Sequence, residues 1–369
     1  MLVNLVVIKI PRVKNFYSLK VSDIEKVTSD CSVISFQVPK ELHSTFKYKQ
    51  GQYLTLKSMI NGEEVRRSYS LCSSPLDTEW KVGVKKIVGG RFSTFANDVL
   101  KVGDEVEVMP PDGKFFVEVD PNKKRQYVAF AAGSGITPIN SIIKTHLEAE
   151  PNSSFKLFFI NQTTASIILK EDLEALKNKY MGRFEVFYFL TKERRSVPLF
   201  NGRIDQEKLD IIFKTICDKD IIDHYFMCGP EAMIKLIDEH LTILGVEKRQ
   251  IHFELFGTST EGNKEVKKEL AASLKDKQCD VTIIEGGVGM DFTMEQGANN
   301  VLDEALINAA DLPFACKGGV CATCKAKLVE GEVKMLVHYG LEDDEVEQGF
   351  ILTCQSIPIT DKLVVDFDV

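Results

Sequence analysis

The chain has 369 residues, of which 44% are hydrophobic, and its formal net charge is −8. This length predicts about two or three domains with ordinary packed cores. No run of about 18 apolar residues occurs, and residues 1–10 are apolar without the cleavage site of a signal peptide. A membrane span is therefore not expected, and the odd number of cysteines, nine, favours a reducing cytoplasm.

The negative charge is concentrated at the C-terminal end. Residues 279–369 carry 5 Lys and no Arg against 17 Asp and Glu, a net charge of −12, whereas the rest of the chain has a charge of +4. An acidic module argues against nucleic acid as a partner. It suits docking to a basic protein surface, with the acidic run 342–345 as a candidate contact. Acidic surfaces that serve only solubility remain the alternative.

Short strands separated by Gly, Pro and Asn-Gly turns follow a lead-in of residues 1–17 and end near residue 120. Several short strands at this spacing predict an antiparallel barrel or sandwich. The predicted strands are residues 32–38, 53–57, 67–71, 80–86 and 105–109.

Strands and helices alternate over residues 121–257, which predicts an α/β domain with a parallel sheet. The predicted strands are residues 127–131, 156–160, 184–190 and 224–228, and the predicted helices are residues 138–150, 169–180, 206–215 and 231–244. Residues 258–278 are polar and rich in Lys and Glu. They predict a linker, partly helical, before a last domain over residues 279–369.

The most specific signal in the sequence is a group of four cysteines. Cys316, Cys321 and Cys324 have the spacing C-x4-C-x2-C, and Cys354 follows alone. This is the plant-type spacing of 2Fe-2S ligands, and it predicts that the four thiolates hold such a cluster. A structural zinc site is the alternative, but zinc sites usually use two short C-x2-C pairs or mixtures of Cys and His. Buried core cysteines are a second alternative.

Two segments of the predicted barrel could bind a ligand that has both an anionic group and a flat ring. Arg67 can pair with a phosphate and Tyr69 offers a flat face at the end of one strand. Residues 90–94, Gly-Arg-Phe-Ser-Thr, open a predicted helix, where glycine allows close approach and the helix N-terminus favours anions. Ser93 and Thr94 offer hydroxyls that are expected to cap this helix. Each signal is weak alone, but their position before an α/β domain strengthens them.

A glycine loop follows the first strand of the predicted parallel sheet. Gly133, Ser134, Gly135, Thr137 and Pro138 lie between strand 127–131 and helix 138–150, the context in which such a loop binds phosphate. Proline stands where the Rossmann fingerprint has its third glycine. Proline is tolerated in a first helical turn because its missing N–H would be unpaired there.

Charge near the glycine loop indicates which dinucleotide such a loop would bind. NAD-binding domains usually place an acid about 20 residues beyond the glycines. Residues 161–164 are Asn-Gln-Thr-Thr instead, and Thr191, Lys192 and Arg203 follow. Cations suit a 2′-phosphate, so NADPH is predicted over NADH, which stays possible. Solvated surface cations are the alternative interpretation.

Residues of about 17–257 resemble the ferredoxin–NADP+ reductase family, through the motifs Arg-x-Tyr-Ser and G-x-G-x-x-P. The resemblance implies an FAD-binding barrel followed by a nicotinamide-binding α/β domain. It implies that Arg67 binds the FAD pyrophosphate, Tyr69 stacks on the isoalloxazine and Ser70 lies near the reactive flavin nitrogen.

Further residues match the same family. The resemblance implies flavin contacts on the next strand and a pyrophosphate turn in the barrel. It also implies a nicotinamide-side motif after a later strand and an acid near the contact between the two rings. The flavin contacts are Gly83, Val84 and Lys85, and the pyrophosphate turn is Gly90, Arg91, Phe92 and Ser93. The nicotinamide-side motif is Cys228, Gly229 and Pro230, and the acid is Glu254.

Residues of about 279–369 resemble plant-type ferredoxins, which implies a β-grasp fold. The whole order of domains, with the cluster last, resembles reductase components of bacterial oxygenases, and in particular the reductase subunits of phenylacetyl-CoA epoxidase complexes. This implies electron transfer from NADPH through FAD and the 2Fe-2S cluster to an oxygenase or epoxidase component. Reduction of a small diffusible acceptor and a non-enzymatic redox sensor are the alternatives.

Overall fold

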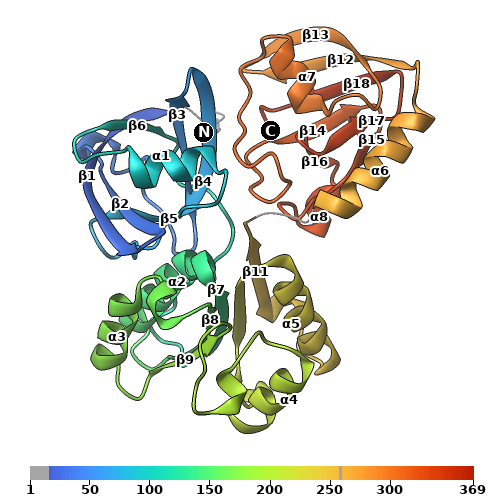
Figure 1. The fold of residues 1–369 in the computed structure, drawn as a ribbon. Coiled ribbons are helices and arrows are strands. Elements are labelled where there is room, and N and C mark those ends of the chain that lie inside the picture. Colours follow the sequence, from blue (N-terminus) through green and yellow to red (C-terminus); the bar gives the residue numbers. More distant parts are fainter. Residues whose placement is uncertain (1–15, 257–259) are drawn as a thin grey trace, which may run out of the picture. The chain divides into compact units, whose positions relative to one another are not determined.

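The computed structural model describes residues 16–256 and 260–369, and most of the predicted lead-in lies outside the described residues. The chain divides into two compact units. One unit is Phe16–Thr258, and the other contains Ser259–Val369. Figure 1 shows two different sheets in the first unit and a mixed sheet in the second. The units are described separately below.

The first sheet is antiparallel and has the strand order β4-β3-β6-β1-β2-β5. Leu71, which directly follows β4, pairs with Val82 of β5 through an isolated bridge, and this joins the two edges of the sheet into a barrel. The helical segments of this part are η1 (Lys40–Leu42) and α1 (Arg91–Asp98). The strands are β1 (Tyr17–Thr28), β2 (Cys31–Gln37), β3 (Tyr53–Ile60), β4 (Glu63–Ser70), β5 (Trp80–Lys85) and β6 (Glu105–Val108).

The predicted barrel is confirmed, but its first strand, β1, was not among the predicted strands. In β1 only Leu19, Val21 and Thr28 are buried, and charged residues occupy most outward positions. Its apolar alternation is therefore too short to signal a strand. The hairpin β3–β4 turns at Asn61 and Gly62, which have φ values of 54° and 80°. Positive φ at both positions is what a tight two-residue hairpin turn requires.

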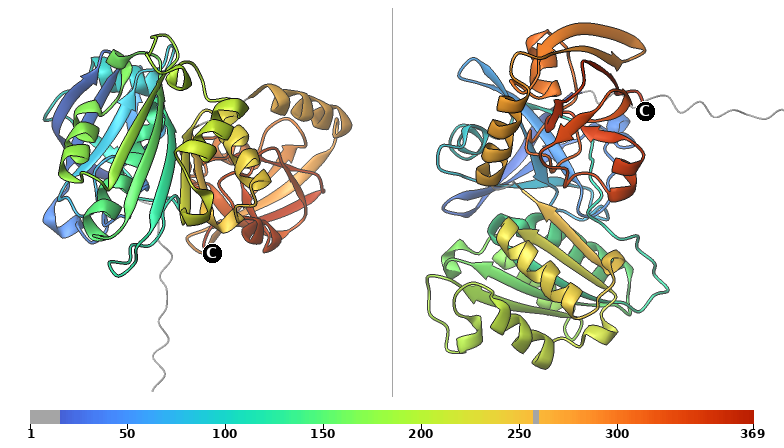
Figure 2. Two further views of the ribbon diagram at one scale, coloured as in Figure 1. Left: turned by 90° about the horizontal axis from the view of Figure 1, so that it is seen from below. Right: turned by 90° about the vertical axis from the view of Figure 1, so that its right-hand side faces the viewer.

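The second sheet is parallel, with the order β11-β10-β7-β8-β9. Figures 1 and 2 show α2 and α3 on one face and α4 and α5 on the other. The strands are β7 (Gln126–Ala132), β8 (Ser154–Asn161), β9 (Phe184–Leu190), β10 (His224–Gly229) and β11 (Ile251–Leu255). The α-helices are α2 (Ile136–Ala149), α3 (Lys170–Lys179), α4 (Gln206–Thr215) and α5 (Glu231–Ile243). Short 3-10 helices are η2 (Gly133–Gly135), η3 (Thr164–Ser166), η4 (Pro198–Phe200), η5 (Lys219–Ile221) and η6 (Lys248–Gln250).

The strand order of this sheet reverses between β7 and β10. The chain runs from β7 to β8 and β9 in one direction, and then crosses to β10 and β11 on the other side of β7. In open α/β sheets the crevice outside the carboxyl ends of the strands at such a reversal is the usual ligand site. This topology brings the residues after β7 and the residues after β10 to the same edge.

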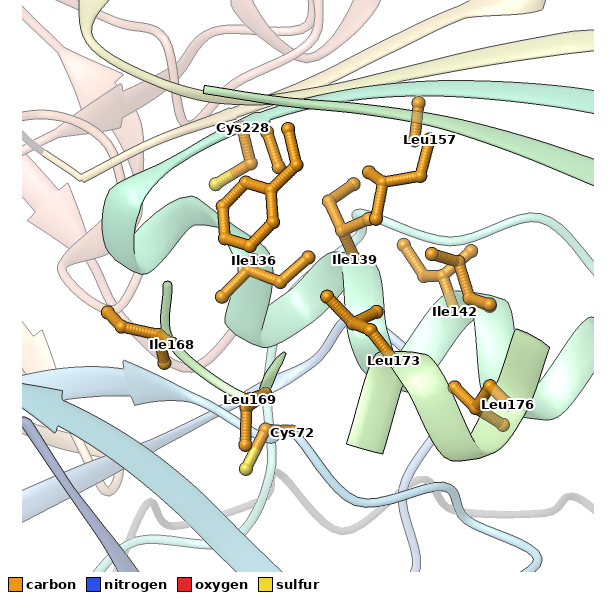
Figure 3. Packing of buried hydrophobic residues seen from close by; sticks show 14 of the residues in the cluster. Cys72, Ile136, Ile139, Ile142, Leu157, Ile168, Leu169, Leu173, Leu176 and Cys228 are labelled. Atoms are coloured by element: carbon orange, nitrogen blue, oxygen red, sulfur yellow. The ribbon is translucent and has the colours of Figure 1, made fainter. Parts of the chain in front are cut away.

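The barrel and the parallel sheet share one hydrophobic core. Figure 3 shows Cys72, which follows the barrel strand β4, beside Leu169, near the start of α3, in one buried cluster. The rings of Phe115 and Phe226 meet edge-on with centroids 5.7 Å apart. Asn140 of α2 donates a hydrogen bond of 3.0 Å to the carbonyl of Cys72. These contacts hold the two sheets in a fixed arrangement.

The C-terminal unit is built on a mixed sheet with the order β13-β12-β18-β14-β16, in which β12 and β18 are parallel. Helix α7 (Val301–Ile307) contributes Val301, Leu302 and Ala305 to the core beneath the sheet. A mixed sheet covered by one helix is the β-grasp arrangement predicted. The strands are β12 (Gln278–Glu285), β13 (Val288–Glu295), β14 (Lys325–Glu330), β15 (Val333–Met335), β16 (Phe350–Leu352), β17 (Ser356–Pro358) and β18 (Lys362–Asp366). The remaining helices are α6 (Thr260–Ser273) and α8 (Asp343–Glu347).

The predicted linker over residues 258–278 is helix over most of its described part, because α6 spans Thr260–Ser273. A Cβ at Gly297 would lie 2.8 Å from Ala271 Cα, and Leu274 is buried. The end of α6 therefore packs on the C-terminal unit through a short apolar edge that the polar composition conceals. Among the described helices, none combines the length and the apolarity that a membrane span needs.

Candidate functional site

The end of β4 carries three of the predicted flavin residues. Arg67 and Tyr69 lie two positions apart, so they share one face of the strand. Arg67 is exposed, and Tyr69 is half-buried with its ring centroid 5.7 Å from that of Phe92. Burial raises the pKa of the Tyr69 hydroxyl, so this side chain stays neutral. An exposed guanidinium beside a fixed flat ring suits a ligand with both a phosphate and a ring system.

Strand β5 brings Gly83, Val84 and Lys85 toward the glycine loop of the parallel sheet. A Cβ at Gly83 would lie 2.5 Å from Thr137 Cγ2, so only glycine fits against α2. Val84 is fully buried in the barrel core, which leaves its backbone as the part able to face a ligand. Lys85 Nζ lies 3.5 Å from Asp30 Oδ2. The same nitrogen would lie 4.0 Å from a Cβ at Gly133, so Lys85 also reaches the glycine loop.

The N-terminus of α1 is left open by its sequence. Its N-cap residue is Gly90, which provides no side-chain hydrogen bond, and a Cβ there would lie 2.4 Å from Ser93 Oγ. Phe92 is buried in the barrel core, whereas Arg91 forms an ion pair of 2.6 Å with Glu63. Free backbone amides at a helix start fit a diphosphate.

The structure corrects the part expected of Ser93 at this helix start. The Ser93 hydroxyl was expected to cap α1, but it accepts a hydrogen bond of 3.2 Å from the amide of Ile87 instead. It holds the preceding loop against the helix. The helix amides therefore have no side-chain competitor at this end.

The glycine loop of the parallel sheet packs directly on the end of β10. Gly133, Ser134 and Gly135 form η2, and Thr137 Oγ1 donates to the carbonyl of Ser134 at 3.0 Å. A Cβ at Gly135 would lie 2.1 Å from the carbonyl oxygen of Cys228. Glycine is therefore required here because the backbone after β7 touches the backbone of β10. Pro138 is buried in the first turns of α2, as predicted for this position.

The residues predicted for the nicotinamide side meet the barrel at Glu254. Cys228 on β10 lies opposite Glu254 on β11, and Ser70 Oγ donates a hydrogen bond of 2.9 Å to Glu254 Oε2. Cys228 is fully buried, and burial, together with the charge of Glu254, raises the pKa of its thiol. Gly229 and Pro230 follow, and Pro230 is the N-cap residue of α5. One cluster thus joins residues from both cofactor motifs.

The predicted cations lie farther out along the same edge. Lys192 and Arg203 are exposed, and Thr191 is half-buried. The amide of Lys192 donates to the carbonyl of Gln162 at 2.8 Å, which ties the loop after β9 to the loop after β8. The nearby carboxylate of Glu193 accepts hydrogen bonds of 2.7 Å from the amide and the hydroxyl of Thr164.

The four predicted cluster ligands form two pairs of neighbouring sulfurs. Cys316 lies against Cys321, and Cys324 lies against Cys354. Among the described residues, no group of three or more Cys, His, Asp or Glu side chains is arranged to hold a single metal ion. Two cysteines for each of two irons is the donor set of a plant-type 2Fe-2S cluster.

Backbone amides surround these sulfurs. The amide of Gly318 donates to Cys316 Sγ at 3.2 Å, and contact with Cys321, aided by this amide, lowers the pKa of the Cys316 thiol. Amides directed at sulfur fit bound thiolates and are one influence on cluster potential. The residues present therefore fit the predicted cluster.

Left-handed backbone conformation in the cysteine loop is not confined to glycine. Gly319 has a φ of 73°, and a Cβ there would lie 3.0 Å from the carbonyl oxygen of Val337. Gly318 has no such contact, whereas Lys317 and Ala322 adopt positive φ values of 51° and 52°. The tight curvature around the cysteines is therefore shared by residues that the sequence does not mark.

One residue beside the cluster ligands was not predicted. Gln355 Nε2 donates to the carbonyl of Lys317 at 2.9 Å and lies 3.7 Å from Cys354 Sγ. It links the cysteine loop to the strand segment that carries the fourth cysteine. Its position next to Cys354 is the only sequence signal that could have suggested this contact.

Family models match the three parts of the chain in order. Residues 18–117 match the oxidoreductase FAD-binding domain, residues 130–239 the oxidoreductase NAD-binding domain, and residues 283–358 the 2Fe-2S iron-sulfur cluster binding domain. These matches cover the flavin, glycine-loop, Cys-Gly-Pro and four-cysteine motifs, whereas Glu254 lies outside the matched ranges.

Proteins of similar sequence and structure cover nearly the whole chain. One of the subunits of the 1,2-phenylacetyl-CoA epoxidase of Escherichia coli is 40% identical over 96% of this chain and 98% of its own length. The ferredoxin reductase component of 3-ketosteroid-9-alpha-monooxygenase of Rhodococcus rhodochrous is 30% identical over 98% of this chain and 99% of its own.

A solved structure has the same fold. Phthalate dioxygenase reductase superposes with a TM-score of 0.59 at 22% identity, and the match covers 97% of this chain and 100% of that chain. The chain therefore belongs to the ferredoxin-reductase type of oxidoreductases that act as electron-transfer components of oxygenase systems, with FAD-binding, NAD-binding and 2Fe-2S domains.

Proposed function

We propose that this chain takes electrons from NADPH and delivers them to an oxygenase, specifically to the epoxidase component that acts on phenylacetyl-CoA. The observation that supports the proposal most is the meeting of the two cofactor motifs at Ser70, Glu254 and Cys228, in a chain that also carries the four-cysteine loop. The substrate class comes from the relative that is 40% identical over almost the full length.

The barrel residues would hold FAD. Arg67 and the open N-terminus of α1, at Gly90, Arg91 and Ser93, would bind its diphosphate, and Tyr69 would lie against its ring. Gly83 would keep β5 packed against Thr137 of α2, since no Cβ intervenes. When bound, FAD would accept two electrons together and release them singly, which links a hydride donor to a one-electron cluster.

The parallel sheet would hold the nicotinamide nucleotide. Gly133, Ser134 and Gly135 would face its diphosphate, and Cys228, Gly229 and Pro230 would border the nicotinamide. The Ser70–Glu254 hydrogen bond would fix a polar wall beside the place where the two rings meet, and buried Cys228 would exclude water as a neutral thiol. None of these side chains needs to act as a nucleophile.

We propose NADPH as the preferred donor, with NADH as the alternative. Lys192 and Arg203 are exposed at the edge where the loops after β8 and β9 meet, and residues 161–164 offer no acid to repel a 2′-phosphate. The carboxylate of Glu193 is engaged by Thr164. Comparing kcat/KM for the two donors tests this, and an NADH preference of about tenfold would contradict it.

The C-terminal unit would hold the cluster through Cys316, Cys321, Cys324 and Cys354 and would present the output surface. Its charge of −12 suits a basic patch on the acceptor, and such steering raises the association rate mainly at low salt. We place the protein in the cytoplasm, where the cysteines outside the cluster loop would stay reduced.

The direct test of the acceptor is reconstitution. The purified chain, NADPH, O2 and a phenylacetyl-CoA epoxidase component should together form epoxide from phenylacetyl-CoA, with one oxygen atom leaving as water and omission of the chain abolishing turnover. Rapid reduction of ferricyanide without any reduction of the epoxidase component would instead favour a small diffusible acceptor. No NADPH oxidation with either acceptor would favour a redox sensor.

A further inference from the structure

An isolated buried amide lies at the carboxyl end of β8. The side chain of Asn161 is 5% exposed, and neither its Nδ2 nor its Oδ1 has a hydrogen-bond partner. The two other buried amides with an unpartnered oxygen in the described part of the chain keep their nitrogen bonded. Asn140 Nδ2 donates to Cys72 at 3.0 Å, and Gln296 Nε2 donates to Thr360 at 2.8 Å. An amide with no partner at either end is costly to bury unless a ligand satisfies it.

Asn161 lies between the two segments proposed to hold the nucleotide. Its neighbour Ile160 pairs with Ala132, the residue directly before the glycine loop. On the other side, Asn161 pairs with Leu190, and its carbonyl accepts a hydrogen bond of 2.9 Å from the amide of Thr191. The backbone of Asn161 is thus fixed directly by β9 and, through its neighbour Ile160, by β7, which gives the amide a defined position at the ligand edge.

This position has a known chemical use in doubly wound domains. The strand beside the glycine-loop strand is where NAD-binding domains place the acid that accepts from the adenosine ribose. Here that strand end carries a neutral amide. Oδ1 can accept from a ribose hydroxyl, and Nδ2 can donate to a ribose oxygen or to a 2′-phosphate. An amide therefore performs the hydrogen bonding of the acid without its charge.

We propose that the Asn161 amide binds the adenosine ribose of the nicotinamide nucleotide, an inference that rests on the nucleotide site proposed above. The neutral side chain accepts the ribose of NADPH without repelling its phosphate, and it also accepts the ribose of NADH. Asn161 is then a binding residue, and cations such as Lys192 supply the preference between the two donors.

The test measures binding to the holoprotein by calorimetry with NADP+, 5′-AMP and nicotinamide mononucleotide. The Asn161→Leu variant should bind NADP+ and 5′-AMP about five- to tenfold more weakly and bind the mononucleotide unchanged. Without nucleotide its Tm should equal or exceed that of the wild type, because leucine removes an unsatisfied amide. The matched control Asn140→Leu should lower Tm, since it removes the bond to Cys72.

A second variant separates recognition from folding. Asn161→Asp should still accept from the ribose of NAD+ but repel the phosphate of NADP+, so the ratio of NAD+ to NADP+ affinity should rise about tenfold. Unchanged 5′-AMP binding in Asn161→Leu, or an unchanged ratio in Asn161→Asp, would overturn the inference. Failure of the wild type to bind any nicotinamide nucleotide would refute the proposed function itself.

Discussion

Ser70 Oγ donates a hydrogen bond of 2.9 Å to Glu254 Oε2, across 184 residues of sequence. Ser70 ends a barrel strand, and Glu254 lies on the edge strand of the parallel sheet, opposite Cys228. Residues from the predicted flavin motif and from the predicted nicotinamide motif therefore touch within one compact unit. Hydride transfer between two bound rings requires this kind of fixed junction.

Removing the Ser70 hydroxyl should slow flavin reduction without emptying the site. A hydrogen bond to a carboxylate contributes about 1.5–3 kcal/mol, so Ser70→Ala should lower the rate by about ten- to a hundredfold. Anaerobic stopped-flow mixing with NADPH measures this rate directly. Ser68→Ala is the matched control, because Ser68 bonds to Thr55 inside the barrel, at 3.2 Å. Equal rates in the two variants would show that the junction is only structural.

Gly83 and Thr137 should behave as a coupled pair. A Cβ at Gly83 would lie 2.5 Å from Thr137 Cγ2, so Gly83→Ala should lower the free energy of unfolding by about 1–3 kcal/mol. Thr137→Ser removes the methyl group but keeps the hydroxyl that donates to Ser134. The double variant should therefore recover most of the loss in urea unfolding. Strictly additive effects would mean that the two residues do not meet.

The barrel and the parallel sheet could be predicted because their signals are local. Turn residues such as Asn61 and Gly62, and the glycine loop before α2, mark boundaries within a few positions. Strand β1 could not be predicted in the same way, since its buried residues are few and its other positions are charged. The barrel nature of the first sheet depends on the pairing of Leu71 with Val82, which no local pattern encodes.

The site was predictable where a residue type is chemically required. The cysteine spacing carries that requirement, and so do Gly135 and Gly83, where a Cβ would collide with neighbouring atoms. Asn161 could not be identified as a candidate, because its distinguishing property is a missing partner inside the fold. The hydrogen bond from the Ile87 amide to Ser93 Oγ could not be predicted either, since it depends on how the loop before α1 folds back.

Lowering the pH should destabilise the first unit, because it protonates Glu150, whose side chain is fully buried. Burial alone would raise the pKa of this carboxyl, but His146 Nδ1 at 3.2 Å and hydrogen bonds from the Asp120 amide and the Tyr127 hydroxyl lower it to about 2. A lowered pKa in the folded state stabilises the protein above pH about 4.5, and this stabilisation is lost as the pH falls toward 2.

The variant Glu150→Gln measures this contribution. At pH 7 it should unfold with a free energy on the order of 3 kcal/mol below that of the wild type. The difference should shrink toward zero as the pH is lowered from about 4.5 to 2, as followed by urea denaturation. A difference that stays constant over this range would mean that the charge of Glu150 adds nothing to stability.

In the acidic run 342–345, only Asp343 and Asp344 should guide docking of the C-terminal unit to its electron acceptor. Glu342 and Glu345 form a capping box at the start of α8, and Glu345 also pairs with Lys325 at 3.1 Å. Changing them would damage the helix. Asp343 and Asp344 are exposed, so Asp343→Asn with Asp344→Asn removes two surface charges while keeping both side chains of the capping box. Electron delivery to the epoxidase component should slow several-fold at low salt and match the wild type at high salt.

The matched control for this surface is neutralisation of two other exposed acids of the same unit, Glu295 and Asp361, which changes the net charge equally. It should leave delivery unchanged. Flavin reduction by NADPH should be the same in all these proteins. Equal slowing in test and control variants would mean that net charge, rather than a defined docking surface, governs the association.

The measurement that tests the central claim most directly compares the wild type with Cys354→Ser, using Cys279→Ala as the control for a buried cysteine outside the cluster loop. Iron content, flavin reduction by NADPH and reduction of the epoxidase component are followed in the same anaerobic preparations. Cys354→Ser should lose its cluster and its delivery to the partner while its flavin is still reduced, and Cys279→Ala should keep all three. Delivery to the partner at the wild-type rate by cluster-free protein would contradict electron transfer through the four-cysteine loop.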